Sequence, residues 1–311
     1  MKELQVALDL AHHVLNEGRP NLGSEMAVRT FVGLYFGLLR EPPQVRYHIY
    51  QNIIPDAIAG KKRSMAQDAE VLLSPYSLRV TGTENIPNDG PLLVTPNHWS
   101  RGPLNSYWTH LALARKIWEV TPEAKRLRFI VQNALLIPGT NKKVPFTDKT
   151  SSMLADLYDV LKVPPPKIRE KDKKATQTEL AREIVQSFKE ERAVGLYPEL
   201  TSSTAIQEGH PLAGLLALKY LRITKEGLIL PVGVYSGKDN KLFINFGEPY
   251  SSVELAFFIP STRNPIIVEK LYREAANFMM SKINPLVPER LRDPILHPDF
   301  IKDVARSIEA A

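Results

Sequence analysis

The hydrophobic and polar positions of the first 75 residues follow helical spacing. One face of the opening segment carries Leu4, Leu8, Ala11 and Leu15. A second helix is expected over residues 25–39, and a third helical stretch precedes the basic residues at 61–63. We therefore expect a helical amino-terminal region over residues 1–75.

From residue 76 onward the pattern changes to short apolar runs that alternate with helical spacing. Strands are expected at 76–82, 91–98, 127–132, 193–199, 228–235 and 241–249. Helices are expected at 104–118, 176–191, 212–224 and 268–283. Alternation of this kind is typical of an α/β fold with a mixed, mostly parallel central sheet flanked by helices. We expect this α/β domain to occupy residues 76–285, and a tail helix to lie within residues 286–311.

Two interpretations of the amino-terminal region remain open. Its most apolar window, Thr30–Leu39, is far shorter than the roughly 20 residues that a helix needs to cross a bilayer. Its aromatic and aliphatic residues would suit a helix lying in the membrane interface. The same amphipathic pattern also suits a helical subdomain packed on the main core.

Composition narrows the chemistry but does not identify it. The chain has 311 residues, of which 43% are hydrophobic and 24% are charged, and this is ordinary for a globular protein. There is no cysteine, so disulfides, thiolate metal sites and a cysteine nucleophile are excluded. The formal charge of +6 would suit an anionic partner. The cations are spread along the chain without a basic stripe, so nucleic acid is not expected as a partner.

No secretory signal peptide is visible at the amino terminus, because no basic run precedes an apolar core. Secretion is therefore not expected. Together with the interfacial interpretation of residues 25–39, this favours a cytoplasmic protein that is peripheral at a membrane surface.

One histidine lies where a ligand would be expected in this fold. The Walker phosphate loop, the zinc protease motif, the nucleophile elbow and the dinucleotide-binding glycine motif are all absent. His98 is the last residue of a predicted strand and precedes Gly102 and Pro103, which are placed to begin a helix. In open α/β sheets ligands bind at the carboxyl ends of strands, and this favours His98 as a chemical group.

Five segments in sequence order resemble the glycerol-phosphate and lysophosphatidic-acid acyltransferase superfamily, the PlsC-type proteins. LRVTGTENIPNDGPLLVTPNH resembles the family's opening, which ends in Asn97-His98 here. VPFTDK, with Asp148 and Lys149, resembles the second motif, and VGLYPELTSS, with Glu199, resembles the third. HPLAGLLAL and LILPVGV resemble the following helix and the fourth motif. Together these segments span about residues 78–250.

The motifs also depart from the family's pattern. Pro103 stands where the first motif has an aspartate, and Lys149 replaces the arginine of the second motif. In the third motif Leu200 replaces the glycine and Ser202 replaces the arginine. Because the family's aspartate orients the catalytic histidine, three possibilities follow. Asp148 or Glu199 reaches His98, a backbone carbonyl orients it, or the protein is inactive.

The resemblance implies transfer of a fatty acyl group from acyl-CoA or acyl carrier protein to a hydroxyl of glycerol phosphate or of a lysophospholipid, in phospholipid biosynthesis. It implies His98 as the general base. The substrate-binding residues that it implies are Asn97, Ser100, Arg101, Asp148, Lys149, Glu199 and Ser202. No metal and no cofactor are expected, and the partners would be the acyl donor, the lipid or glycerol-phosphate acceptor and a membrane surface.

Two alternatives to this function are kept. Pro103 favours a catalytically inactive, lipid-binding relative of the fold. The missing arginines of the second and third motifs favour an acceptor without phosphate. Trp99, Tyr107 and Trp108 would line an acyl groove in an active enzyme, but aromatic residues at this spacing also suit the core.

Overall fold

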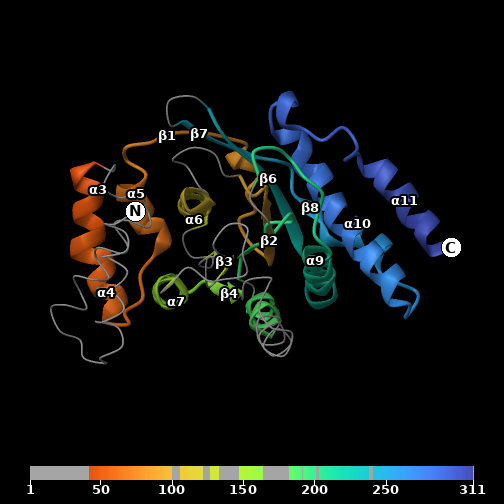
Figure 1. Ribbon diagram of the computed structural model, residues 1–311, viewed down its shortest axis with the longest axis horizontal. Coiled ribbons are helices and arrows are strands. Elements are labelled where there is room, and N and C mark those ends of the chain that lie inside the picture. The colour runs from red at the N-terminus through yellow and green to blue at the C-terminus, as the bar shows by residue number, and fades with distance from the viewer. Residues whose placement is uncertain are drawn as a thin grey trace, which may run out of the picture. The chain divides into compact units, whose positions relative to one another are not determined.

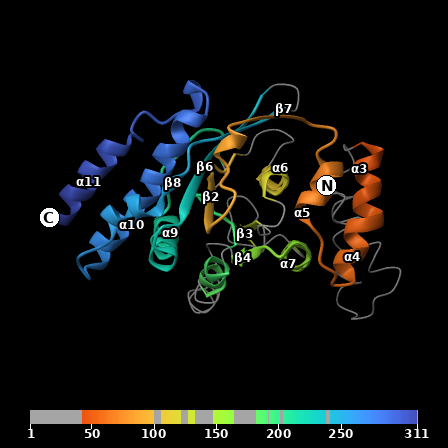
Figure 2. The ribbon, with the colours of Figure 1, turned by 180° about the vertical axis from the view of Figure 1, so that it is seen from behind.

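The structure is a computed structural model of the chain, shown as ribbons in Figures 1 and 2. It describes residues 42–99, 106–121, 127–132, 147–163, 182–190, 192–200, 203–237 and 241–310. The chain divides into two compact units. The small unit is Met1–Pro75 with Val131–Leu180, and the large unit is Tyr76–Ile130 with Ala181–Ala311.

The described part of the small unit is mainly helical, as the sequence predicts for residues up to 75. Its elements are α3 (Pro43–His48), the π-helical turn η2 (Ile49–Ile53), α4 (Ile54–Ile58), α5 (Met65–Leu72), α7 (Thr147–Tyr158) and the short strand β4 (Leu161–Val163). The sequence pattern gave no indication of α7 or β4. The first two of the three helices expected in the amino-terminal region lie outside the described residues.

A buried carboxylate, Asp68 on α5, links the helices of the small unit. It accepts hydrogen bonds from Arg63 Nε at 2.7 Å, from Tyr158 Oη at 2.9 Å and from His48 Nε2 at 2.9 Å. Burial alone would raise the pKa of Asp68, but these hydrogen bonds outweigh it and hold the pKa below its usual value. The charge on Asp68 therefore joins residues from α3, α5 and α7.

The large unit is built on a mixed sheet, and most of its strand pairs are parallel. Its strands are β1 (Ser77–Thr81), β2 (Leu92–Pro96), β3 (Arg128–Gln132), β5 (Val194–Gly195), β6 (Leu228–Ser236), β7 (Lys241–Phe246) and β8 (Tyr250–Ser251). The order is β1-β7-β6-β2-β5-β3, with β8 beside β6. The pairs β1/β7, β2/β6, β2/β5 and β3/β5 are parallel, and β6 is antiparallel to β7 and β8. This confirms the predicted fold class.

Helices cover both faces of this sheet (Figures 1 and 2). α6 (Ser106–Val120) lies on one face, while α9 (Pro211–Thr224) and α10 (Pro265–Ile283) lie on the other, and α11 (Pro298–Ala310) packs on α10. Another helix covers residues 182–189. Short 3-10 helices complete the unit: η3 (Thr83–Asn85), η4 (Ser252–Phe258), η5 (Asn284–Leu286) and η6 (Glu289–Leu291).

The central strands are buried on both faces, because helices flank them. All five residues of β2 are buried, and Leu93 and Val94 are 0% exposed. Such continuous apolar runs are typical of parallel strands between two helical layers. By contrast, the end strand β1 alternates between exposed and half-buried positions. The functional side chains must therefore lie where the central strands end.

The predicted strand at 193–199 is shorter than expected. Only Val194 and Gly195 form β5, and the chain then turns at Pro198 and Glu199. Leu200 N donates a hydrogen bond to Tyr197 O at 3.1 Å, which closes this turn. The turn takes the last residues of the predicted strand away from the sheet and places them beside the end of β2.

Candidate active site

His98 and Glu199 come together at one edge of the large unit's sheet. His98 is the second residue after β2, and Glu199 is the fourth residue after β5. β2 and β5 are parallel neighbours, so their carboxyl ends lie at the same edge. His98 N donates a hydrogen bond to Glu199 Oε2 at 2.6 Å, across 101 positions of sequence. Two residues that the sequence analysis took from different motifs are therefore in direct contact.

Asn97, the residue before His98, anchors the main chain to β6. Its side chain is 2% exposed and bonds to both main-chain groups of Val234 on β6. Asn97 Nδ2 donates to Val234 O at 2.9 Å, and Val234 N donates to Asn97 Oδ1 at 2.6 Å. The amide thus extends the β2/β6 pairing beyond the last backbone pair, Pro96 with Val232. That Asn97 also binds substrate stays a prediction.

The main chain of His98 is held on both sides. Its N–H bonds to Glu199, and its carbonyl accepts a hydrogen bond from Ser203 N at 2.9 Å. Trp99 N also donates to Asn97 O at 2.9 Å, which makes a tight three-residue turn centred on His98. The imidazole is half-buried and packs on the ring of Tyr197, with centroids 4.4 Å apart. The side chain is therefore ordered by its neighbours and still partly accessible.

The carboxyl group of Glu199 is almost completely buried. Its side chain is 3% exposed, and it accepts a second main-chain hydrogen bond from Gln207 N at 3.2 Å. Burial raises the pKa of Glu199 to about 7, and the hydrogen bonds from His98 and Gln207 oppose this rise. The group therefore changes its protonation state near neutral pH.

Behind His98 lies a buried group of rings that the sequence analysis did not connect with the site. Tyr197 and His110 are 4% and 7% exposed, and their ring centroids are 5.3 Å apart. His110 also packs on Phe129 of β3 at 4.3 Å. Burial lowers the pKa of His110 to about 3, with a further contribution from His98, and burial raises the pKa of the Tyr197 phenol well above 10. Both rings are therefore uncharged at neutral pH.

One signal for Tyr197 was present in the sequence, since it directly precedes Pro198-Glu199. His110 gave no such signal, because a histidine on a buried helix face has the spacing of an ordinary core residue.

Leu200 adopts the backbone conformation that usually requires glycine. Its φ is +55°, in the left-handed region that L-residues other than Gly, Asn and Asp rarely occupy. The motif that this segment resembles has a glycine at this position. Leucine takes the same kind of backbone conformation here. A leucine in this region costs about 1–2 kcal/mol, and such strain persists only where the surrounding contacts impose it.

The other predicted substrate-binding residues are not brought to the site by the described structure. Ser100, Arg101 and Ser202 lie outside the described residues, as does Pro103. Asp148 and Lys149 are in the first turn of α7, in the small unit, and their side chains also lie outside the described part. Their roles stay predictions.

Two of the aromatic residues considered for an acyl groove are core residues. Trp99 is 2% exposed, and its Nε1 donates to Ser236 Oγ at 3.1 Å. Trp108 is 5% exposed and packs on the ring of Tyr76 at 4.8 Å. The side chain of Tyr107 lies outside the described residues. The core interpretation therefore holds for Trp99 and Trp108.

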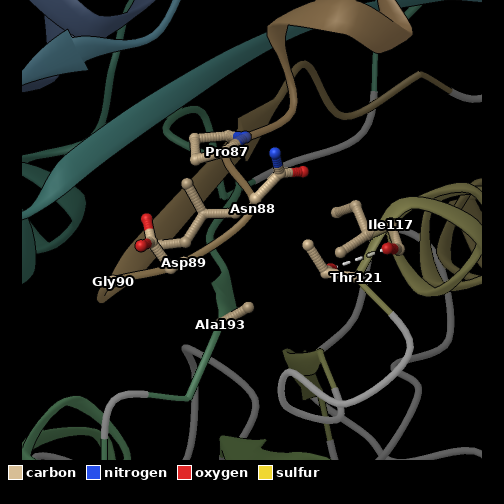
Figure 3. Close-up of a pocket in the computed structure, with 8 residues that line it drawn as sticks. Pro87, Asn88, Asp89, Gly90, Ile117, Thr121 and Ala193 are labelled. Carbon is tan, nitrogen blue, oxygen red and sulfur yellow. Dashed lines mark hydrogen bonds between the residues drawn. The ribbon is translucent and has the colours of Figure 1, made fainter.

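A hollow in the large unit lies at the opposite edge of the sheet (Figure 3). It encloses about 230 Å³, open solvent included. It is lined by Pro87, Asn88, Asp89 and Gly90 of the turn before β2, by Leu92, by Ile117 of α6, by Thr121 directly after α6, and by Ala193. These residues lie at the amino-terminal ends of β2 and β5, whereas His98 and Glu199 follow the carboxyl ends. Since ligands of open α/β sheets bind at the carboxyl ends, the hollow is not the candidate site.

No helix within the described ranges is long and apolar enough to cross a membrane. In the same part of the chain, no three acidic or histidine side chains are grouped closely enough to hold a metal ion.

The chain is similar to a solved acyltransferase structure. No family model and no curated protein sequence matches the chain. The crystal structure of the 1-acyl-sn-glycerophosphate acyltransferase PlsC from Thermotoga maritima is similar at 17% identity, covering 81% of this chain and 96% of that one. The TM-score is 0.39.

Proposed function

We propose that this chain is an acyltransferase that moves a fatty acyl group from acyl-CoA or acyl carrier protein to a hydroxyl group of glycerol phosphate or of a lysophospholipid. The proposal starts from the five segments that resemble the PlsC-type motifs in order. The observation that carries it is the 2.6 Å hydrogen bond between His98 and Glu199. Residues of the first and third motif-like segments meet at the sheet edge where a substrate would bind.

In the proposed reaction His98 is the general base. The imidazole takes the proton of the acceptor hydroxyl while the hydroxyl oxygen attacks the thioester carbonyl carbon. The tetrahedral intermediate then collapses, the carbon–sulfur bond breaks, and the leaving thiolate receives the proton from the imidazolium. His98 is half-buried and its ring packs on that of Tyr197, and this supports the role of a positioned base.

The acceptor and the donor would be bound by residues around His98. Arg101 and Lys149 are the proposed partners of an acceptor phosphate, and Ser100 and Ser202 supply hydroxyl groups, with Asn97 and Asp148 completing the proposed substrate-binding set. The reaction needs no metal and no cofactor besides the thioester donor.

An acyl-transfer assay with purified protein tests this function. Labelled acyl-CoA and acyl carrier protein would be offered with glycerol 3-phosphate, lysophosphatidic acid, a neutral lysophospholipid and a monoacylglycerol as acceptors. We expect His98→Ala to reduce turnover by at least about 100-fold, the lower range for removal of a general base. His297→Ala is the matched control, because His297 is an exposed histidine whose side chain is 69% accessible.

Equal product from the wild type and His98→Ala would reject His98 as the base. Turnover of the monoacylglycerol alone would instead favour an acceptor without phosphate, which the missing arginines of the motifs suggest.

Pro103 supports a second candidate function, an inactive relative that binds lipid. It stands at the position where the resembled motif has the acid that orients the histidine. Saturable binding of a lysophospholipid, together with no turnover of any donor and acceptor pair, would support this candidate over the enzyme.

A further inference from the structure

We propose that Glu199 is the positioning residue of His98, and that it acts through the main chain of His98 rather than by contacting the acceptor. This inference rests on the proposed function, since it assigns a role in the same reaction. The geometry that supports it is a clamp, by which we mean the contacts that Tyr197, Glu199 and Ser203 make with His98.

The clamp holds three different parts of one residue. The carboxylate of Glu199 receives the N–H of His98 at 2.6 Å, and the N–H of Ser203 donates to the carbonyl of His98 at 2.9 Å. The ring of Tyr197 packs on the imidazole at 4.4 Å. All three contacts come from one stretch of seven residues, so a displacement of that stretch would displace the imidazole.

The stretch itself is anchored to the rest of the large unit. Glu199 Oε1 accepts from Gln207 N at 3.2 Å, and Pro198 O accepts from His210 N at 2.8 Å. Ser203 also forms a parallel bridge with Trp99, the residue after His98. The two oxygens of Glu199 thus join the His98 turn to the segment that leads into α9.

The burial of Glu199 argues against a direct contact with the acceptor. Its side chain is 3% exposed, and each carboxylate oxygen is already used by a main-chain donor. His98 is half-buried and is the more exposed residue of the pair. In this proposal a substrate meets the imidazole and not Glu199.

The left-handed backbone of Leu200 supports the clamp, although Leu200 is not one of its three residues. The turn that Leu200 closes directs Glu199 back toward His98 instead of along the direction of β5. Strain of this kind is retained where the surrounding structure requires a particular geometry.

Glu199→Gln tests the proposal, because it keeps the shape of the side chain. The glutamine oxygen can accept one N–H, but its NH₂ group then faces the other donor, so one arm of the clamp is lost. We expect kcat to fall by about tenfold or more, since small displacements of a catalytic group have large effects on rate. We expect the KM for the acceptor to change by less than about twofold, because Glu199 does not contact the acceptor in this proposal.

The control is Glu208→Gln, the same chemical change at an exposed position in the same segment, for which we expect wild-type kcat and KM. Glu199→Asp is the second variant, since it keeps the carboxyl group but shortens the reach, and it should recover part of the lost kcat. A rise in acceptor KM at unchanged kcat for Glu199→Gln would overturn the proposal and assign Glu199 to the acceptor.

A measurement without substrate separates this proposal from the proposed function. The ring signals of His98 would be recorded by NMR in protein with labelled histidine and assigned with His98→Gln. We expect Glu199→Gln to shift these signals, while Glu208→Gln leaves them in place. Shifted signals would support the clamp even if no acceptor were turned over, and unchanged signals would overturn it even in an active enzyme.

Discussion

Glu199 is the residue at which burial and ionisation conflict most directly. The protein places this carboxyl group in a position with 3% exposure, and its pKa rises to about 7 from an ordinary value of 4.5. The hydrogen bonds from His98 and Gln207 only partly compensate for the lost hydration. The cost of ionising a buried carboxyl group makes stability depend on pH.

We predict that Glu199 makes the free energy of unfolding fall as the pH rises from about 4.5 to about 7. In this window the folded protein keeps a proton on Glu199 that the unfolded chain releases, so folding is favoured at the acidic end. The raised pKa corresponds to about 3 kcal/mol over the whole window. The measurement is urea unfolding of the wild type and Glu199→Gln at pH values between 4.5 and 8.

His110 makes the free energy of unfolding rise with pH, because burial lowers its pKa to about 3. This contribution is the same in the wild type and in Glu199→Gln, so it cancels when these two proteins are compared. A wild-type stability that stays parallel to that of the glutamine variant would contradict the prediction.

Leu200 gives a second prediction at the residue scale. Leu200→Asn keeps the branched shape of the side chain and Leu200→Val shortens it, but asparagine tolerates a positive φ and a β-branched residue does not. We therefore expect the valine variant to be less stable than the asparagine variant by about 1 kcal/mol, although valine is the more hydrophobic residue. Denaturant unfolding of both variants measures the difference, and the opposite order would show that burial outweighs backbone strain here.

At the scale of elements, the motif-like residues Gly82 and Asn85 serve the fold. They lie in the turn between β1 and β2, where Asn85 Nδ2 donates to Phe246 O at 3.1 Å. Gly82 has φ +73°, and a Cβ built on it would lie 2.0 Å from the same carbonyl oxygen. The turn therefore packs directly on the end of β7, and this explains a glycine and an asparagine at these positions without any role in substrate binding.

Gly82→Ala and Gly90→Ala test this packing as a matched pair. Both glycines have a positive φ, +73° and +79°, but a Cβ on Gly90 would meet no atom within 4 Å. We expect Gly90→Ala to cost about 1 kcal/mol from the backbone alone. We expect Gly82→Ala to cost at least about 2 kcal/mol more, because the clash is with main-chain atoms. Equal losses of unfolding free energy in the two variants, measured by chemical denaturation, would mean that the turn moves away from β7 easily.

At the scale of the whole molecule, the proposed substrates would bring the protein to a membrane surface. The sequence offers one candidate for this contact, the apolar face of residues 25–39, for which a packed helical subdomain is the other interpretation. The net charge of +6 suits anionic lipid. Both interpretations make definite predictions for the same pair of variants.

We predict that Leu34→Glu combined with Leu38→Glu reduces binding of the full chain to anionic vesicles by more than about tenfold, because two buried leucines would be lost from the interface. Vesicle flotation measures the bound fraction. Gly33→Glu combined with Gly37→Glu is the control, since it adds the same charges with the same spacing away from the apolar face. Unchanged flotation of the leucine variant together with a lower thermal stability would instead support the packed subdomain.

The local pattern of the sequence was sufficient for most elements of the large unit. The strands at residues 77–81, 92–96 and 228–236 and the helices at 106–120 and 211–224 lie where apolar periodicity predicts them. Burial on one face produces such periodicity, and burial on both faces produces a continuous apolar run. The pattern missed α7 and β4 and made β5 too long, because the turn after Gly195 is set by contacts with other segments.

The sequence by itself determined that His98 and Glu199 each lie at the end of a predicted strand, since both positions can be found from neighbouring residues. Only the tertiary structure decided that they meet, because parallel pairing of β2 with β5 joins residues 101 positions apart. It also decided that Glu199 bonds to the main chain of His98, that Asn97 bonds to β6, and that Leu200 takes a left-handed backbone. Each of these depends on which segments become neighbours, and that choice is made by burial of the whole sheet and not by local propensity.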